Sequence, residues 1–115
     1  MSSIRKISQD HFQSLLRSNP RPFLVEFGAD WCPPCKALLP VLEELSEEFS
    51  SQVDIFRVDV ETEELLAVQF MIRSLPTVIA FKEGRAVEEL FGKQPKANYV
   101  AAISKLIKTQ QQDRL

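Results

Sequence analysis

Apolar residues occur in this chain either as short continuous runs or at helical spacing, and the two patterns alternate along most of its length. Continuous runs indicate β-strands, and apolar residues at i, i+3 and i+4 indicate amphipathic helices. Ser8 and Thr62 are expected to cap helices, and Pro34 suits a first helical turn. The pattern predicts strands over residues 3–7, 23–27, 53–60, 77–81 and 86–91, and helices over 8–18, 34–49, 62–70 and 95–108.

The run over residues 23–27 is nearly all apolar, which is typical of a strand covered on both faces, and Glu26 is its one polar residue. Strands linked by helices in the first half of the chain predict parallel pairing. The last two strands are joined by residues 82–85 and predict an antiparallel hairpin. The predicted fold class is therefore α/β, a central five-stranded mixed sheet flanked by four helices.

A length of 115 residues with 44% apolar content suits one domain, which we place at residues 1–108. Residues 109–115 include three glutamines and are expected to form a disordered tail. The net charge is −2, and no basic stripe is present, which argues against nucleic acid or a membrane as a partner. Residues 1–12 lack the apolar core of a signal peptide, so we expect a cytoplasmic protein, and we expect a monomer.

The two cysteines of the chain lie side by side in the hexapeptide Trp31-Cys32-Pro33-Pro34-Cys35-Lys36. A two-residue spacer at the start of a helix brings both sulfurs to one end of that helix, where they can form and open a small disulfide. In a cytoplasmic protein, a lone close pair is more often catalytic or metal-binding than structural. The pair therefore indicates a redox switch.

The positions of the two cysteines predict different roles in disulfide exchange. One sulfur must attack as a thiolate, and the other must displace the substrate from the mixed disulfide. Cys32 precedes the helix, whose dipole and free N–H groups stabilise an anion, so it suits the attack. Cys35 lies one turn in, is expected to be more shielded and suits the resolving step. Lys36 adds a nearby cation, and Trp31 offers a flat apolar surface to a substrate.

Two other classes of function stay open. A binding module or holdase would use a groove beside the cysteines with little redox turnover. A metal site is the other class, because Cys-x-x-Cys is half of a zinc site. His11 is the single histidine, so further ligands would have to come from carboxylates or a second chain. We interpret His11 as an ordinary surface residue.

Further motifs accompany the hexapeptide: an acid six residues before the first cysteine, Pro40 in the following helix, Ile72-Arg73-Ser74-Leu75-Pro76-Thr77 before a strand, and Phe81-Lys82-Glu83-Gly84 with Gly92 further on. With these motifs the chain resembles thioredoxins along nearly its whole length. The resemblance implies the thioredoxin fold and a protein-disulfide reductase without a cofactor other than its Cys32–Cys35 disulfide. It also implies disulfide-containing substrate proteins and an electron donor of the thioredoxin-reductase type.

The resemblance further implies a substrate-binding surface. Pro76 is expected in the cis form, facing the cysteines, although most X-Pro bonds are trans. The backbone of Ser74 and Leu75 is expected to pair with an extended substrate segment, and Gly92 and Trp31 are expected to belong to the same surface.

Glu26 falls where the family usually has a buried aspartate that exchanges protons with the resolving cysteine. A carboxyl group in an apolar strand should have a raised pKa, as a base working near neutral pH requires. The competing interpretation is a glutamate at the edge of the sheet with its carboxylate in solvent. Arg57 stands where many members have a lysine near this acid, and it is expected to hold Glu26 more ionised.

Several positions depart from the common family pattern. Pro33 replaces a glycine and lacks the N–H that would help to solvate the Cys32 sulfur, so we expect an altered reduction potential, of either sign. Gly28 stands where a tryptophan is frequent, which should leave the surface beside the cysteines less filled. Ser74 and Met71 each replace a frequent glycine.

Overall fold

The apolar run around Glu26 forms a strand, β2 (Phe23–Gly28), in which every residue is buried. The computed structural model describes residues 4–18 and 21–112. Its other strands are β1 (Arg5–Lys6), β3 (Asp54–Asp59), β4 (Thr77–Lys82) and β5 (Arg85–Phe91). Its helices are α1 (Gln9–Ser18), α2 (Pro33–Glu48), α3 (Glu64–Gln69) and α4 (Lys96–Gln112).

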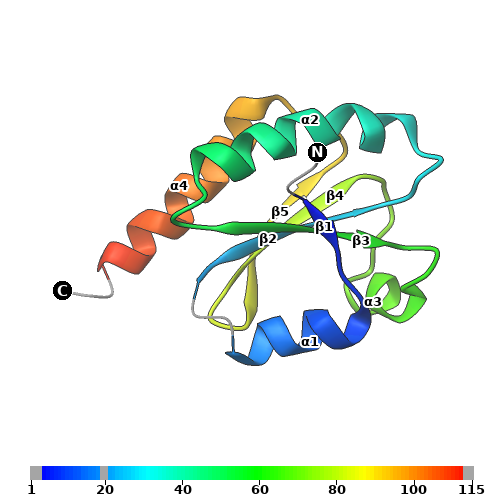
Figure 1. Cartoon of the computed structure of the whole chain (residues 1–115), viewed down its shortest axis with the longest axis horizontal. Coiled ribbons are helices and arrows are strands. Elements are labelled where there is room, and N and C mark those ends of the chain that lie inside the picture. The colour runs from blue at the N-terminus through cyan, green and yellow to red at the C-terminus, as the bar shows by residue number, and fades with distance from the viewer. Residues whose placement is uncertain (1–3, 19–20, 113–115) are drawn as a thin grey trace.

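The strands form one five-stranded sheet in the order β1-β3-β2-β4-β5, with β2 in the middle. β3 is parallel to both β1 and β2, whereas β4 is antiparallel to β2 and β5. Helices α2 and α4 lie on one face of the sheet, and α1 and α3 lie on the other (Figure 1). The predicted mixed sheet flanked by four helices is therefore confirmed, and so is the covering of β2 on both faces.

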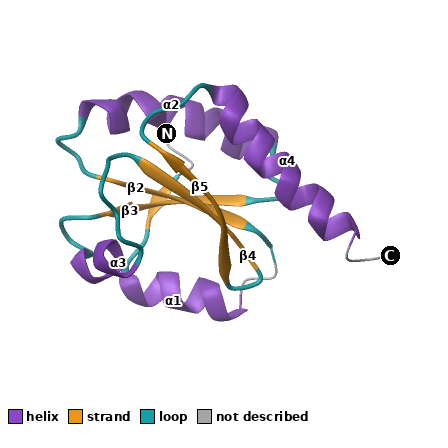
Figure 2. Ribbon diagram, turned by 180° about the vertical axis from the view of Figure 1, so that it is seen from behind, coloured by secondary structure: helices purple, strands orange, loops and turns teal. Residues whose placement is uncertain are grey.

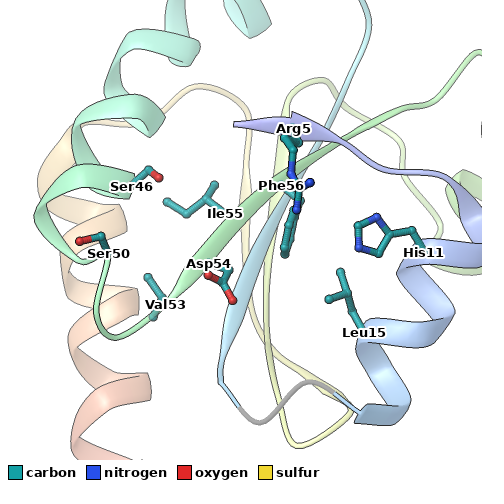
Figure 3. A pocket seen from close by; sticks show the side chains of 9 residues that line it. All are labelled: Arg5, His11, Leu15, Ser46, Ser50, Val53, Asp54, Ile55 and Phe56. Atoms are coloured by element: carbon teal, nitrogen blue, oxygen red, sulfur yellow. The ribbon is translucent and has the colours of Figure 1, made fainter. Parts of the chain in front are cut away.

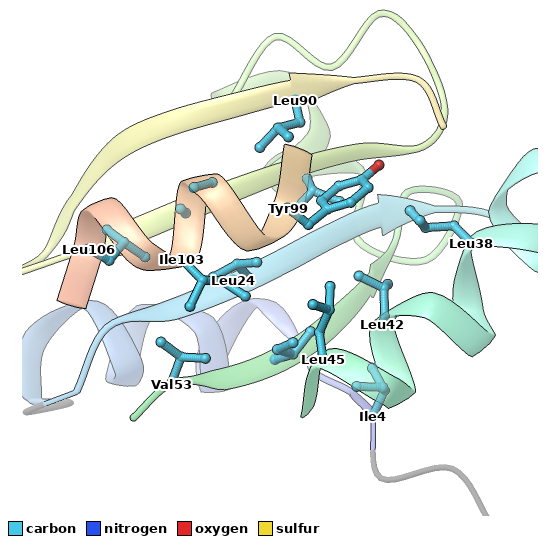
Figure 4. Packing of buried hydrophobic residues seen from close by; sticks show 14 residues of the cluster. Ile4, Leu24, Leu38, Leu42, Leu45, Val53, Leu90, Tyr99, Ile103 and Leu106 are labelled. Atoms are coloured by element: carbon cyan, nitrogen blue, oxygen red, sulfur yellow. The ribbon is translucent and has the colours of Figure 1, made fainter. Parts of the chain in front are cut away.

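Alternation along β2 sends its side chains into two separate cores. Leu24 belongs to the core between the sheet and the α2 and α4 helices (Figure 4). Phe23, Val25 and Phe27 belong to the core on the α1 and α3 face, which is rich in phenylalanine. Because Glu26 alternates with Val25 and Phe27, its side chain starts on the α2 side of the sheet.

The predicted ends of helices and strands agree with the structure at some positions and differ from it at others. The predicted cap at Ser8 is confirmed, since Ser8 Oγ accepts the N–H of His11 at 3.2 Å. The first strand contains two residues instead of the five predicted. The last helix is longer than predicted and ends at Gln112, so residues 109–112 of the expected tail are helical. Residues 113–115 of that tail lie outside the described residues.

The predicted cap at Thr62 is wrong. Helix α3 begins at Glu64 after an N-cap at Glu63, and Thr62 Oγ1 donates to the carbonyl of Asp59 at 3.4 Å. The same Asp59 carbonyl accepts the N–H of Glu63 at 2.9 Å, and the Asp59 carboxylate accepts the N–H of Glu61 at 2.8 Å. A turn around Asp59 therefore occupies these groups before the helix starts.

The predicted hairpin is confirmed, but its turn consists of Glu83 and Gly84 alone, because Lys82 and Arg85 of the predicted connection belong to β4 and β5. Glu83 and Gly84 both have positive φ, 53° and 77°, which the common two-residue hairpin turn requires. Viewed from the opposite side, the hairpin crosses in front of β2 and β3 (Figure 2). Within the described residues, no helix is long and apolar enough to cross a membrane.

The phenylalanine core should contribute strongly to the stability of the fold. Phe12 is fully buried, and its ring centroid lies 5.3 Å from that of Phe81 and 5.4 Å from that of Phe70. We expect Phe12→Ala to lower the free energy of unfolding by about 3–5 kcal/mol, measured by denaturant titration, because it opens a cavity in this core. Phe91→Ala is the matched control, since Phe91 is 61% exposed. Its loss should stay within about 0.5 kcal/mol, and equal losses for the two variants would contradict the assignment of this core.

Candidate active site

The cysteine pair lies at the start of α2, and its local geometry follows from the two prolines. Cys32 is the N-cap residue, with extended φ and ψ of −89° and 108°, and Pro33 and Pro34 occupy the first helical positions. Neither proline has an N–H, so the first helical N–H belongs to Cys35. That N–H donates to Cys32 Sγ at 3.3 Å. Cys32 and Cys35 form a disulfide with a Cα–Cα distance of 5.3 Å.

Both cysteines are covered. Cys32 is 3% exposed and Cys35 is 2% exposed, so the expected difference in shielding is almost absent in the disulfide form. Ala29 completes the buried cluster, and Val60 and Leu75 pack against it. Both cysteines belong to the same apolar cluster, whose other members come from distant parts of the chain, so sequence position alone did not predict their equal burial.

Glu26 is buried in the middle of the sheet, 1% exposed, so the interpretation of a carboxylate in solvent is wrong. The β2–β3 register places it opposite Arg57, and Arg57 Nε donates to Glu26 Oε1 at 3.0 Å. Oε2 is buried and has no hydrogen-bond partner among the described residues. Burial raises the pKa of Glu26 above its ordinary value, while the hydrogen bond and charge of Arg57 oppose part of that rise.

Glu26 and Cys35 meet at Gly28, the last residue of β2. A carbon atom in the Cβ position of Gly28 would overlap Glu26 Oε2 and would lie 3.0 Å from Cys35 Sγ. The unpartnered oxygen of the carboxylate and the sulfur of Cys35 therefore border the same small space. The structure brings together the acid and the cysteine that the family resemblance linked.

Among the other predicted residues, Leu75 packs against the cysteine cluster. Trp31 is 62% exposed, and its Nε1 donates to Glu61 Oε1 at 2.7 Å. The Leu75–Pro76 peptide bond is cis, as the resemblance implied. The carbonyl of Pro76 accepts the N–H of Gly92 at 2.8 Å, which joins these two residues. Ser74 and Lys36 are both exposed.

Sequence reasoning missed Ala29, Val60 and Glu61 at this site. Val60 and Glu61 follow the carboxyl end of β3, and Ala29 follows the carboxyl end of β2. These strands are parallel, so their carboxyl ends share one edge of the sheet. That rule, applied to the predicted strands, would have placed all three residues beside the cysteines.

A hollow of about 480 Å³ adjoins the cysteine cluster. Val60 and Leu75, which pack against the disulfide, form part of its wall. The rest of its lining comes from α3 and the loop after it: Glu64, Ala67, Val68, Ile72 and Arg73. An apolar hollow beside a reactive disulfide is suited to hold a substrate side chain.

A different hollow, of about 360 Å³, lies between α1, β3 and the end of α2 (Figure 3). It is lined by His11, whose ring centroid is 5.9 Å from that of Phe56, and by no residue predicted for the redox site. Over residues 4–18 and 21–112, no group of three or more His, Cys, Asp or Glu side chains is placed to hold a metal.

A disulfide that closes across the first turn of a helix, against a buried acid, can be opened and reclosed by thiol exchange. Together with the fold, it defines the class of the thiol-disulfide oxidoreductases. The family model described as Thioredoxin matches residues 3–105. The chain belongs to the thioredoxin family, and it is a protein-disulfide reductase.

Individual relatives show how closely the chain follows this family. It is 40% identical to Thioredoxin C-2 of Corynebacterium nephridii over 106 residues, which cover 92% of this chain and 98% of that protein. It is 38% identical to thioredoxin of Staphylococcus haemolyticus over 103 residues, 90% of this chain and 97% of that protein. The solved thioredoxin of Malassezia sympodialis matches with a TM-score of 0.82 at 30% identity, covering 92% of each chain.

Removing the cation beside Glu26 should raise the pKa of this acid further. We expect Arg57→Met to do so, because it deletes both the hydrogen bond and the charge that favour the carboxylate. The titration can be followed through the side-chain carboxyl carbon by NMR. Lys6→Met is the control, since Lys6 lowers the pKa of Glu26 less and acts by its charge alone. An equal shift in both variants would refute the dominant role of Arg57.

The raised pKa of Glu26 also predicts how stability depends on pH. A raised pKa means that the folded state binds the proton more tightly than the unfolded state, so this stabilising contribution is complete below the ordinary value of 4.5. It is lost as the pH rises through the folded-state pKa, by about 1.4 kcal/mol for each unit of difference. Relative to the parent protein, Glu26→Gln should therefore gain stability with rising pH in denaturant titrations. A difference that stays constant with pH would contradict this linkage.

Proposed function

We propose that Cys32 attacks substrate disulfides and that Cys35 resolves the mixed disulfide. The observation that carries this division is the place of Cys32 at the N-cap of α2, where its sulfur accepts the Cys35 N–H. This hydrogen bond and the positive end of the helix dipole both favour a thiolate at Cys32. Cys35 lies inside the helix and borders the buried carboxylate of Glu26, which suits a thiol that must lose its proton later.

The reaction then proceeds in two exchanges. The Cys32 thiolate attacks one sulfur of the substrate disulfide, the substrate S–S bond breaks, and the other substrate sulfur leaves as a thiolate. Cys35 next loses its proton and attacks Cys32 Sγ. The bond between Cys32 and the substrate breaks as the Cys32–Cys35 disulfide forms. Two electrons pass to the substrate, which is reduced to two thiols, while the protein is oxidised.

Glu26 is the proposed acceptor of the Cys35 proton. Its Oε2 is the carboxylate oxygen that Arg57 leaves free, and it borders the same space as Cys35 Sγ. Because burial raises the pKa of Glu26, the acid holds a proton more readily near neutral pH than a carboxylate in water does.

The proposed substrate surface surrounds the covered disulfide. An extended substrate segment would pair with the backbone of Ser74 and Leu75 beside the cis Pro76, and Gly92 and Trp31 would flank it. The exposure of Trp31 and the contact of Leu75 with the cysteine cluster support this placement. The apolar hollow bordered by Leu75 offers room for a neighbouring substrate side chain.

The remaining proposals concern tuning and partners. Pro33 and Pro34 limit the N–H groups near Cys32, Lys36 adds positive charge at the start of α2, and Arg57 adjusts Glu26. The proposed partners are disulfide-containing proteins and an electron donor of the thioredoxin-reductase type that reopens the Cys32–Cys35 disulfide. We propose that the protein works in the cytoplasm, since a reductant needs a compartment whose thiols are kept reduced. We also propose that it works as a monomer.

Cysteine variants test the division of roles. Cys32→Ser should abolish insulin reduction, because no attacking thiolate remains at the N-cap. Cys35→Ser should accumulate a covalent adduct with insulin through Cys32, because nothing resolves the mixed disulfide. The adduct can be measured by mass spectrometry under non-reducing conditions.

The same assay separates a reductase from a binding module. A holdase would give no dithiol-dependent turnover, and Cys32→Ser would then match the parent protein. An adduct that forms on Cys35 in Cys32→Ser as fast as one forms on Cys32 in Cys35→Ser would overturn the assigned order.

A further inference from the structure

Gly28 differs from the other two glycines of the chain in what requires a glycine at its position. Gly84 and Gly92 have φ values of +77° and +69°, which L side chains rarely adopt. The φ of Gly28 lies outside that range, and the residue continues the ladder of β2 opposite Asp59. The backbone conformation at position 28 therefore suits any L residue except proline, and only the surrounding space calls for glycine.

The occupant of that space is the carboxylate of Glu26. Residues 26 and 28 are two apart in one strand, so their side chains leave the sheet on the same face. A Cβ at position 28 would overlap Glu26 Oε2, and its next nearest neighbour would be Cys35 Sγ at 3.0 Å. The end of the glutamate side chain thus lies where a larger residue at 28 would begin.

Hydrogen bonding alone does not determine where Oε2 lies. Arg57 holds Oε1 at 3.0 Å, but Oε2 has no hydrogen-bond partner among the described residues. A carboxylate held through one oxygen can turn about that bond, and the free volume at Gly28 is what admits Oε2 beside Cys35. The groups that act electrostatically on or with Glu26 come from three other elements: Arg57 and Asp59 of β3, Lys6 of β1 and Tyr99 of α4.

We propose that Gly28 is a positioning residue for the resolving step, because its missing side chain lets Glu26 bring Oε2 to Cys35 Sγ. The inference rests on the proposed role of Glu26 as proton acceptor. Glu26 and Gly28 then act as one unit, in which the length of the acid and the absence of a Cβ two residues later compensate each other. A side chain at 28 would turn the carboxylate away from the thiol, because the overlapping atom is the end of a flexible side chain, while Cys35 Sγ at 3.0 Å would have to shift slightly.

Stopped-flow mixing of the reduced protein with 5,5′-dithiobis(2-nitrobenzoate) tests this proposal. The first thionitrobenzoate is released when Cys32 attacks the reagent, and the second when Cys35 resolves the adduct. In Gly28→Ala the second phase should slow by about 10-fold or more at neutral pH, and its pH profile should move to higher pH, because Cys35 must ionise without a positioned base. The first phase should change less.

A double-variant cycle separates positioning from crowding. Aspartate is one methylene shorter and does not reach the space at Gly28, so Glu26→Asp should remove most of the effect of Gly28→Ala. The close contact between the new Cβ at position 28 and Cys35 Sγ is present with either acid at position 26, so its effect cancels in the comparison. Gly84→Ala is the stability control: it strains a hairpin turn at the far end of β4 and should leave the pH profile of the second phase unchanged.

Two outcomes would overturn the proposal, and they are distinct from failure of the proposed function. If Glu26→Gln slows the second phase but Gly28→Ala does not, Glu26 keeps its role and Gly28 loses the one proposed. If Gly28→Ala slows it equally in the glutamate and aspartate backgrounds, crowding is the cause and positioning is refuted. If Glu26→Gln leaves the second phase unchanged, the role of Glu26 fails first, and the inference fails with it.

Discussion

The complete burial of β2 is the constraint on which the rest of this structure depends. A strand covered on both faces needs a helical layer on each side, and it is the reason why the four helices divide into two pairs. The same burial places the carboxylate of Glu26 in an apolar interior, where a charge is unfavourable unless it is paired. Arg57 on the neighbouring strand supplies a partner to one oxygen, and the second oxygen has no hydrogen-bond partner among the described residues.

The cysteine cluster forms just beyond the end of the buried strand β2. Beyond Gly28 the chain leaves the sheet, and Ala29, Cys32 and Cys35 collect in a small apolar cluster of their own. Val60 reaches the cluster from the end of β3, and Leu75 reaches it from the cis peptide before β4. Three segments far apart in the sequence therefore meet because their strands are neighbours in the sheet. The site is a product of strand order more than of any single motif.

Much of the fold was predictable because its signals are local. Apolar periodicity located the nine helices and strands of the described residues, and the cap at Ser8 depends on residues three apart. Thr62 failed as a cap because a turn centred on Asp59 competes for the same groups, and periodicity does not report such competition. The added length of α4 was missed because its last residues are polar.

The site was predictable in its residues but not in its environment. The spacing of the cysteines pointed to the disulfide, whereas the cis bond at Pro76 followed only from the family resemblance. A lone acid in an apolar strand left burial and exposure of Glu26 equally open, since the sheet position of a strand is a tertiary property.

The near-equal burial of the two cysteines has a further consequence. Exchange rates depend on access, so we expect a disulfide whose cysteines are both buried to react slowly with dissolved thiols. We expect a partner that docks beside Trp31 and Leu75 to react faster, because its contacts hold it at the covered disulfide.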